Sequence, residues 1–328
     1  MKFDEDLAPQ EDVIVSATRV KIERIEIFKR WVSMGFHATM TYLSKDDAFL
    51  KREDTSLLSQ DSKSILVFLL NYKHKIASRE GYGMIASYAS FKDYHNFFPE
   101  MINRFMVENQ LFIKEFKTFV DTGPVTERGI AEQSSLGWIG RNSMLINSRM
   151  GSFTFIGGAV TDMVLDEIHF PSPDLCGRCT RCIDNCPTGA INMDRTVNSN
   201  LCISYHTIEN RDVIPRVISE KMGNMIFGCD ICNDVCPWNR GKRESTLPVV
   251  QEDLFSSRMR LEDIAYLDKE QFGKQFRESA IKRATFEGLA RNALIALHNS
   301  GEDHLVREVA REFSDLRRRQ AALLMGEI

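Results

Sequence analysis

The sequence lacks a long apolar run, an export leader and an excess of basic residues. The longest apolar run, ILVFLL at 65–70, is too short to cross a bilayer, and the first ten residues, MKFDEDLAPQ, contain no apolar segment. We therefore expect neither a membrane span nor a signal peptide, and a cytoplasmic location. The net charge of -4 predicts no overall field that attracts nucleic acid, so a polyanionic partner would need a local basic patch.

Cysteine is also absent from most of the chain. All eight cysteines lie between Cys176 and Cys236, several of them in Cys-x-x-Cys spacing. A disulfide scaffold would be a small secreted protein with cysteines distributed throughout. The observed distribution favours ligation of a metal or a cluster.

Composition divides the chain into three regions, and the predicted fold class is α+β. Residues 1–168 mix helical and strand patterns without a steady βαβ rhythm, residues 169–245 hold every cysteine, and residues 246–328 form a helical tail. The two prolines of HFPSPD at 169–174 indicate a linker between the first two regions.

Hydrophobic periodicity predicts the main elements. They are a helix over 18–34, a buried strand over 64–72, one or two helices with an aromatic face over 93–119, a hairpin over 143–166 that turns at residues 149–151, and tail helices over 286–301 and 304–325. Asn299, Ser300 and Gly301 provide the stop signal between the two tail helices.

The cysteine spacing is typical of two [4Fe–4S] clusters. In Cys-x2-Cys-x2-Cys-x3-Cys-Pro, three thiolates wrap one cluster and the fourth is directed to another. The second motif, Cys229-x2-Cys232-x3-Cys236-Pro237, and the isolated Cys202 complete the two sets. The first predicted set is Cys176, Cys179, Cys182 and Cys236, and the second is Cys186, Cys202, Cys229 and Cys232.

Structural zinc is the alternative to clusters. Zinc sites usually present two Cys-x2-Cys knuckles for each metal and have no use for three evenly spaced thiolates followed by Cys-Pro. The clusters imply that the protein transfers electrons. Because the reduction potentials of such clusters span roughly -700 to +450 mV, they do not identify the electron acceptor. The region of residues 1–168 is large enough to hold it.

Two short motifs in the first region are weak. GYGMIA at 81–86 matches Gly-x-Gly-x-x-Gly/Ala but does not directly follow a strand, so dinucleotide binding is disfavoured. DYH at 93–95 begins like an Asp-x-His-x-x-Gly cobalt-ligating loop, but Phe98 occupies the glycine position. We therefore exclude cobalt ligation by this loop and interpret His95 as a packing histidine.

The densest candidate for a catalytic site is VDTGPVTERGIAEQSSLGWIGRNSMLI at 120–146. Asp121 begins a turn, and Glu127 and Arg128 follow within a few residues. A surface turn that precedes a helix explains the same residues, so local pattern alone does not decide between the two interpretations.

Five segments taken in order are VDTGPVTER, AEQSSLGWIGRNSML, CGRCTRCIDNCPTGAI, LCISY and GCDICNDVCPWNR. This combination resembles the epoxyqueuosine reductases, cobalamin-dependent iron–sulfur enzymes that complete queuosine in tRNA. The likeness extends from about Arg52 to Asn239 and more weakly into RNALIAL at 291–297. Reductive dehalogenases share the general plan but are in general exported, and no export signal is visible here.

The resemblance implies a nitroreductase-like domain that holds cobalamin base-off, a ferredoxin-like module with two clusters, and a tail resembling HEAT repeats. It also implies reduction of the epoxide at the wobble position of tRNA, with Asp121 as proton donor. An ordinary Asp has a pKa of about 3.9 and is ionised at pH 7, so we expect burial under the corrin and the base to raise the pKa of Asp121. The cobalamin contacts that the resemblance suggests are Arg52, Ser87, Asp121, Thr126, Glu127, Arg128, Leu145, Ile156 and Ser204.

The family's Gly-Trp-x-Gly-Lys-Asn appears here as GWIGRN, with Arg141 in the lysine position. Arginine keeps the charge but not the point-like ammonium, which puts a specific role of the lysine in doubt. The tail shows two helices where longer relatives carry several repeats, so tRNA contacts could be fewer or elsewhere.

Local basic runs could contact tRNA phosphates in spite of the negative net charge. They comprise Arg317, Arg318 and Arg319 with Arg307 and Arg311, and the run Arg240, Lys242 and Arg243. A solvated helix face is the alternative for each run. We expect a monomer that takes electrons from an external low-potential donor.

Two other functions stay open from the sequence. One is a cytosolic corrinoid reductase of a small molecule, and the other is a ferredoxin-type electron-transfer protein without a catalytic site of its own. A corrin absorption band in the purified protein would exclude the second.

Overall fold

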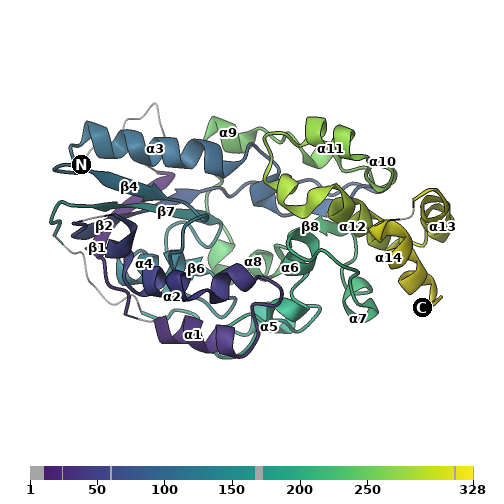
Figure 1. Cartoon of the computed structure of the whole chain (residues 1–328), viewed down its shortest axis with the longest axis horizontal. Helices are drawn as coiled ribbons and strands as arrows, with labels where there is room; N and C mark the ends of the chain where they lie inside the picture. Colours follow the sequence, from purple (N-terminus) through teal and green to yellow (C-terminus); the bar gives the residue numbers. More distant parts are fainter. Residues whose placement is uncertain (1–10, 24, 60, 167–172, 314, 328) are drawn as a thin grey trace.

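A computed structural model describes residues 11–23, 25–59, 61–166, 173–313 and 315–327. A sheet with helices on both sides occupies one end of an elongated molecule, and the last helices of the chain occupy the other end (Figure 1). The mixture of helices and antiparallel strands confirms the predicted α+β class.

The main sheet has four strands in the order β1-β2-β7-β4, and each neighbouring pair is antiparallel. The central strand β2 is buried along its whole length, as its continuous apolar run predicts. The strands are β1 (Val13–Arg19), β2 (Ser64–Asn71), β4 (Phe116–Phe119) and β7 (Thr154–Thr161).

Alternate residues of β2 build two separate cores. Leu66, Phe68 and Leu70 pack with α3 (Tyr94–Glu108), whereas Ile65, Val67 and Leu69 pack with residues of α4 (Glu127–Gln133). Helices α1 (Ile25–Ser33) and α2 (Asp46–Glu53) lie on the same side as α4 (Figure 1). The sheet therefore positions the start of α3 and the start of α4, and both carry site residues.

Two predicted helical segments contain strands instead. Residues 13–19 form β1, so the predicted helix over 18–34 shortens to α1, Ile25–Ser33. The aromatic segment 93–119 forms α3 and then β4, because Phe119 packs into the core beside β7. Phenylalanines at spacings of three and four fit a helix in sequence, and pairing with β7 overrides that local pattern.

The predicted hairpin over 143–166 is wrong in its pairing. A tight turn does close between Asn147 and Gly151. However, β6 (Leu145–Ile146) pairs with β5 (Trp138–Ile139), and β7 pairs with β2 and β4. The two halves of the expected hairpin therefore belong to different sheets.

The cysteine segment and the tail consist of short helices around one shared core. Its buried members include Ile203, Ile226, Leu261, Leu294 and Leu324, so they come from both segments. The helices are α5 (Arg181–Asp184), α6 (Ile203–Ile208), α7 (Arg216–Ser219), α8 (Ile231–Asp234), α9 (Pro248–Gln251), α10 (Leu261–Ala265), α11 (Lys269–Gln275) and α12 (Thr285–Asn299).

The chain ends in α13 (Asp303–Glu312) and α14 (Leu316–Met325), where the sequence predicted one helix over 304–325. Asp315 accepts a hydrogen bond from the backbone N–H of Arg317 and so begins a new helix. The predicted linker over 169–174 lies mostly outside the described residues, and the three-domain division stays a prediction.

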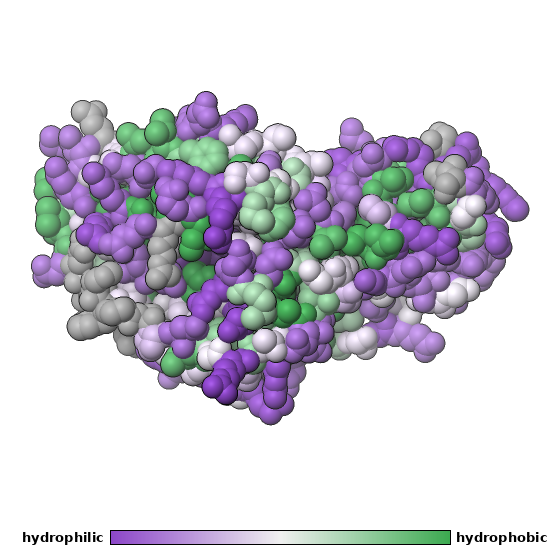
Figure 2. Space-filling view, turned by 90° about the horizontal axis from the view of Figure 1, so that it is seen from below, coloured by the Kyte–Doolittle hydropathy of each residue, from purple (hydrophilic) through white to green (hydrophobic). Residues whose placement is uncertain are grey.

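A further link joins the first region to the cysteine segment. Strand β3 (Met84–Ile85) pairs in parallel with β8 (Met225–Phe227), far apart in the sequence. Within the described ranges, the chain forms no helix with the length and apolar character that a membrane crossing requires. The face shown in Figure 2 is largely hydrophilic, with hydrophobic side chains in patches between polar ones.

Candidate active site and cluster sites

Asp121 lies just beyond the end of β4 in a left-handed backbone conformation, with φ of 55°. The preceding Val120 is buried in the core, whereas the Asp121 side chain is 62% exposed. Non-glycine residues in this conformation are uncommon, and aspartate is among the residues that tolerate it. The buried strand end therefore holds the backbone while the carboxylate projects outward.

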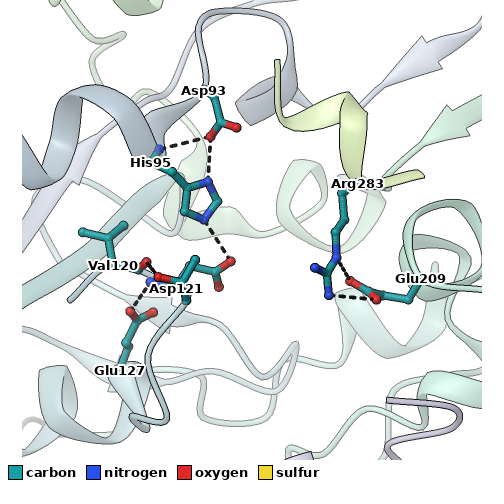
Figure 3. Close-up of polar contacts among 8 residues, drawn as sticks. Asp93, His95, Val120, Asp121, Glu127, Glu209 and Arg283 are labelled. Atoms are coloured by element: carbon teal, nitrogen blue, oxygen red, sulfur yellow. Dashed lines mark hydrogen bonds and ion pairs between the residues drawn. The ribbon is translucent and has the colours of Figure 1, made fainter. Parts of the chain in front are cut away.

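His95 connects Asp121 to a second carboxylate (Figure 3). Its Nδ1 lies 2.6 Å from Oδ1 of Asp93, and its Nε2 lies 3.3 Å from Oδ2 of Asp121. Asp93 also accepts the backbone N–H of His95 as the N-cap of α3. The interpretation of His95 as a packing histidine is wrong, because both ring nitrogens contact carboxylates.

The contacts with these carboxylates favour the charged form of His95. Partial burial works against that form, but hydrogen bonds to Asp121 and Asp93 raise the pKa of His95 to about 9. The same His95 hydrogen bond lowers the pKa of Asp121 below its ordinary value, against the effect of burial. The rise in the pKa of Asp121 that we expect under the corrin and the base stays a prediction, and the protein residues alone act in the opposite direction.

Glu127, in the first turn of α4, is the third acid at this site. Its Oε1 accepts the backbone N–H of Asp121, so the two residues are held together (Figure 3). Burial and the neighbouring Asp121 carboxylate raise the pKa of Glu127 to about 8. At pH 7 the site thus holds protons on His95 and Glu127, with an ionised Asp121 beside them.

An ion pair that the sequence did not predict lies across from Asp121 and His95 (Figure 3). Arg283, in the short helix η7 (Ala280–Ala284) of the tail, donates from Nε and Nη2 to the Glu209 carboxylate at 2.7 and 3.2 Å. Its charge helps to lower the pKa of Asp121. No local motif marks this pair, because its members come from separate regions of the sequence.

Several of the suggested cobalamin contacts gather around the start of α4. Arg52 is buried, donates to the carbonyl of Ala48 at 3.1 Å and lies over the ring of Phe28. Its own carbonyl accepts the Thr126 hydroxyl at 3.5 Å. Arg128, on α4, donates to the Ser143 hydroxyl at 2.8 Å. Arg52, Asp121, Thr126, Glu127 and Arg128 therefore form one neighbourhood.

The remaining suggested contacts lie on other elements. Leu145 is buried in the core beside α4, and Ile156 packs against the same core. The Ser87 backbone N–H and hydroxyl both donate to Oδ2 of Asp230, at 2.7 and 2.6 Å. Ser204 is half-buried on α6, two residues after Cys202. Ser87 and Ser204 are thus associated with the second cysteine set, and no direct contact joins them to Asp121.

The structure brings the cysteines together in one region, and their division into two ligand sets stays a prediction. Burial raises the pKa of the Cys182 thiol to about 11, and Cys176 and Cys236 lie near enough to add to this rise. Burial also raises the pKa of Cys229 to about 12, with Cys202 and Cys186 among its neighbours. Cys232, whose pKa is also raised, has Cys229 and Cys202 nearby. All eight are free thiols.

The first cysteine set surrounds a small cavity of about 50 Å³. Its lining includes Cys176, Cys179, Cys182 and Cys236 together with Arg141 and Trp238. The Nε of Arg141 is buried and has no hydrogen-bond partner in the described part of the chain. Four thiolates and an unpaired N–H donor fit a cluster that carries negative charge. No three His, Cys, Asp or Glu side chains among the described residues are arranged to hold a metal ion, so the cluster site is inferred from the cysteine spacing and the shared cavity.

A buried polar network fixes the cysteine segment to the first region. The side-chain oxygen of Asn233 accepts a hydrogen bond from the side-chain amide of Asn142 at 3.1 Å and another from the Ser152 hydroxyl at 2.9 Å. Asn239 accepts the backbone N–H of Ser152 at 2.8 Å and donates back to its hydroxyl at 2.9 Å. Because every member has a partner, the network holds the cluster segment in one position.

The basic residues that we predicted to contact phosphates differ in exposure and in pairing. Arg317 is 2% exposed, pairs with Asp315 and donates to backbone carbonyls, so it is not available to a phosphate. Arg319 pairs with Asp212, and Arg243 pairs with Glu11. The exposed members of the two runs include Arg240, Arg307 and Arg311.

Comparison with known proteins gives two family matches. Residues 52–122 match the model described as epoxyqueuosine reductase QueG, DUF1730, and residues 175–239 match the 4Fe-4S double cluster binding domain. The second match agrees with the cysteine geometry and assigns two [4Fe–4S] clusters to this segment.

Curated relatives and solved structures match most of the chain. Epoxyqueuosine reductase of Cyclobacterium marinum is 36% identical over 85% of this chain and 89% of its own, and that of Leadbetterella byssophila is 38% identical over 85% and 91%. A solved epoxyqueuosine reductase with an epoxyqueuosine-modified tRNA-Tyr stem loop aligns with TM-score 0.87 and 26% identity, covering 98% of this chain and 89% of that one.

Proposed function

The chain belongs to the epoxyqueuosine reductase family, and from this premise we propose that it reduces epoxyqueuosine to queuosine at the wobble position of tRNA. The solved relative with a modified tRNA stem loop supports this substrate. Converting the epoxide to an alkene consumes two electrons and two protons and releases water. The enzyme therefore needs an electron supply and a proton supply that meet at one site.

Electrons enter through the two [4Fe–4S] clusters from an external low-potential donor. We propose that the chain also binds cobalamin, which would supply the electrons for removal of the oxygen and would be held base-off, as the resemblance to the family implies. Both nitrogens of His95 are engaged by Asp93 and Asp121, which supports a corrin without a histidine ligand from this loop.

The proposed contacts to cobalamin are Arg52, Ser87, Asp121, Thr126, Glu127, Arg128, Leu145, Ile156 and Ser204. The cluster of Arg52, Thr126, Glu127 and Arg128 at the start of α4 supports a polar part of this site. Leu145 and Ile156 would supply apolar packing. Ser87 bonds to Asp230, next to Cys229, and Ser204 follows Cys202, so they would mark the side from which electrons arrive.

The observation that carries the proton chemistry is the contact between His95 Nε2 and Asp121 Oδ2. The departing epoxide oxygen must be protonated, and an ionised Asp121 cannot donate by itself. His95 holds a proton at pH 7 because its pKa is about 9. In our proposal the proton on His95 Nε2 passes to Oδ2 of Asp121, and Asp121, which contacts the substrate, then donates it to the departing oxygen.

The domain organisation, location and oligomeric state are also proposed from the likeness to the family. The first region, residues 1–168, would be the nitroreductase-like cobalamin domain, residues 169–245 the ferredoxin-like module, and residues 246–328 a short tail resembling HEAT repeats. The protein would be a cytoplasmic monomer. The exposed Arg240, Arg307 and Arg311 are candidates for contacts to tRNA phosphates.

Nucleoside mass spectrometry tests the proposed function. The purified protein, loaded with clusters and cobalamin and supplied with a chemical reductant, is incubated with tRNA that contains epoxyqueuosine. We expect queuosine to appear in the digested tRNA with the loss of epoxyqueuosine. A protein that binds a corrin but leaves the tRNA unchanged would contradict the proposal and would favour a small-molecule substrate.

A further inference from the structure

Arg141 carries a buried hydrogen-bond donor that the fold leaves unpaired. Its Nε has no partner in the chain as described, although its Nη2 donates to the carbonyl of Gly177 at 2.9 Å. Leaving a buried donor unpaired costs about 1–3 kcal/mol, so each example in a native structure requires an explanation. A partner outside the polypeptide is the simplest explanation.

The position of Arg141 indicates which partner that is. Its side chain lines the small cavity formed by Cys176, Cys179, Cys182 and Cys236. Gly177, which accepts its other hydrogen bond, lies between the first two of these cysteines. The guanidinium is therefore held against the loop that wraps the first cluster.

We propose that Arg141 donates its Nε–H to the cluster bound by Cys176, Cys179, Cys182 and Cys236 and raises the reduction potential of that cluster. Hydrogen bonds to cluster sulfurs and the net charge nearby are among the factors that set such potentials. Reduction adds one electron and therefore one negative charge to the cluster. A fixed N–H donor and a cation stabilise the reduced form more than the oxidised form.

The effect is specific to one cluster. The cavity that Arg141 lines contains all four cysteines of the first set and none of the second. The electron comes from the external reductant, and no proton transfer is required of Arg141. Arg141 is thus a positioning residue for electron flow and makes no proposed contact with the substrate.

A redox titration of the cluster-loaded protein, followed by electron paramagnetic resonance, tests the proposal without tRNA or turnover. In Arg141→Met we expect one of the two cluster midpoints to become more negative. The expected change is at least tenfold in the reduction equilibrium, or about 59 mV for one electron. Arg141→Lys keeps the charge but loses the Nε–H, so its shift should have the same sign and a smaller size.

Arg181→Met is the matched control, because Arg181 lines the same cavity but is exposed to solvent. Its charge is screened by water, so its effect on the midpoint should be smaller than that of Arg141→Met. The iron content of each variant is measured to confirm that it holds both clusters. If Arg141→Met does not hold both clusters, the midpoints of Arg141→Lys decide the question. Unchanged midpoints in Arg141→Lys, equal shifts in the Arg181 control, or equal shifts of both clusters would overturn the proposal.

Discussion

At the scale of single residues, the three ionisable groups around Asp121 differ in the direction of their pKa shifts. Asp121 has a lowered pKa because His95 donates to it, whereas the pKa values of His95 and Glu127 are raised to about 9 and about 8. A lone aspartate in a turn could not supply a proton at neutral pH. The neighbours of Asp121 therefore decide whether it can act as an acid.

The pH dependence of turnover follows from His95. A raised histidine pKa means that the proton is present at neutral pH and is lost as the pH rises through about 9. Turnover of the wild type should fall along that alkaline limb. In His95→Gln we expect the rate at pH 7 to fall roughly 100-fold and the limb near pH 9 to disappear.

Single-turnover rates measured from pH 6 to about 10 check this prediction. The matched control is His304→Gln, because His304 is exposed on α13 and distant in sequence from the site. An unchanged limb near pH 9 in His95→Gln would show that another group controls the proton supply.

At the scale of elements, the turn between β6 and β7 positions the cluster segment. Gly151 adopts φ of 81°, and a Cβ there would lie 2.1 Å from the side-chain oxygen of Asn239. That oxygen accepts the backbone N–H of Ser152, so the turn and the end of the cysteine segment fit closely together. A glycine is required for both its backbone conformation and its small volume.

Gly151→Ala should therefore lower the free energy of unfolding by about 2–4 kcal/mol, from left-handed strain and overpacking together. Gly241→Ala is the matched control, since Gly241 has φ of 69° but nothing within 4 Å of a built Cβ. It should cost only about 1 kcal/mol. Urea unfolding of the two variants gives the comparison, and equal losses would show that the contact with Asn239 is unimportant.

The elements also show how far the sequence could predict the fold. The continuous apolar run of β2 and the striped pattern of α12 were sufficient to predict both elements. Segment 116–119 was misinterpreted because its phenylalanines, at spacings of three and four, fit a helix, and only the pairing with β7 makes it a strand. The double-cluster segment could be predicted because cluster ligation restricts local spacing, and the division of its cysteines into two sets stays a prediction.

The contact between His95 and Asp121 could not be predicted in the same way. It joins the start of α3 to the end of β4 across 26 sequence positions, and it depends on the order of strands in the sheet. The motif at 93–95 drew attention only as a possible cobalt ligand. The Arg283–Glu209 pair likewise depends on how the tail packs onto α6.

At the scale of the whole molecule, the tail and the cysteine segment are one packed unit. Arg291 on α12 is completely buried and donates to the backbone carbonyls of His206 and Asn210 at 2.7 and 3.0 Å. The adjacent Asn292 donates to the carbonyls of Thr207 and Ile226. The tail therefore supports α6, which follows Cys202, a predicted cluster ligand.

Arg291→Met should destabilise the protein by about 3 kcal/mol or more, because it leaves buried carbonyls without donors. Arg307→Met, at an exposed position of α13, should change the free energy of unfolding by less than about 0.5 kcal/mol. Chemical denaturation of both variants measures the difference. Equal stability would mean that the buried guanidinium does not hold α12 against α6.

The most direct test of the account is the conversion of epoxyqueuosine-containing tRNA by Asp121→Asn, measured by nucleoside mass spectrometry. The comparison is Asp263→Asn, an exposed aspartate on α10, with corrin absorption and iron content confirmed in both. We predict that Asp121→Asn loses roughly 100-fold or more of the turnover and that Asp263→Asn keeps it. Full turnover by Asp121→Asn with its cofactors in place would contradict the assignment of Asp121 as the acid.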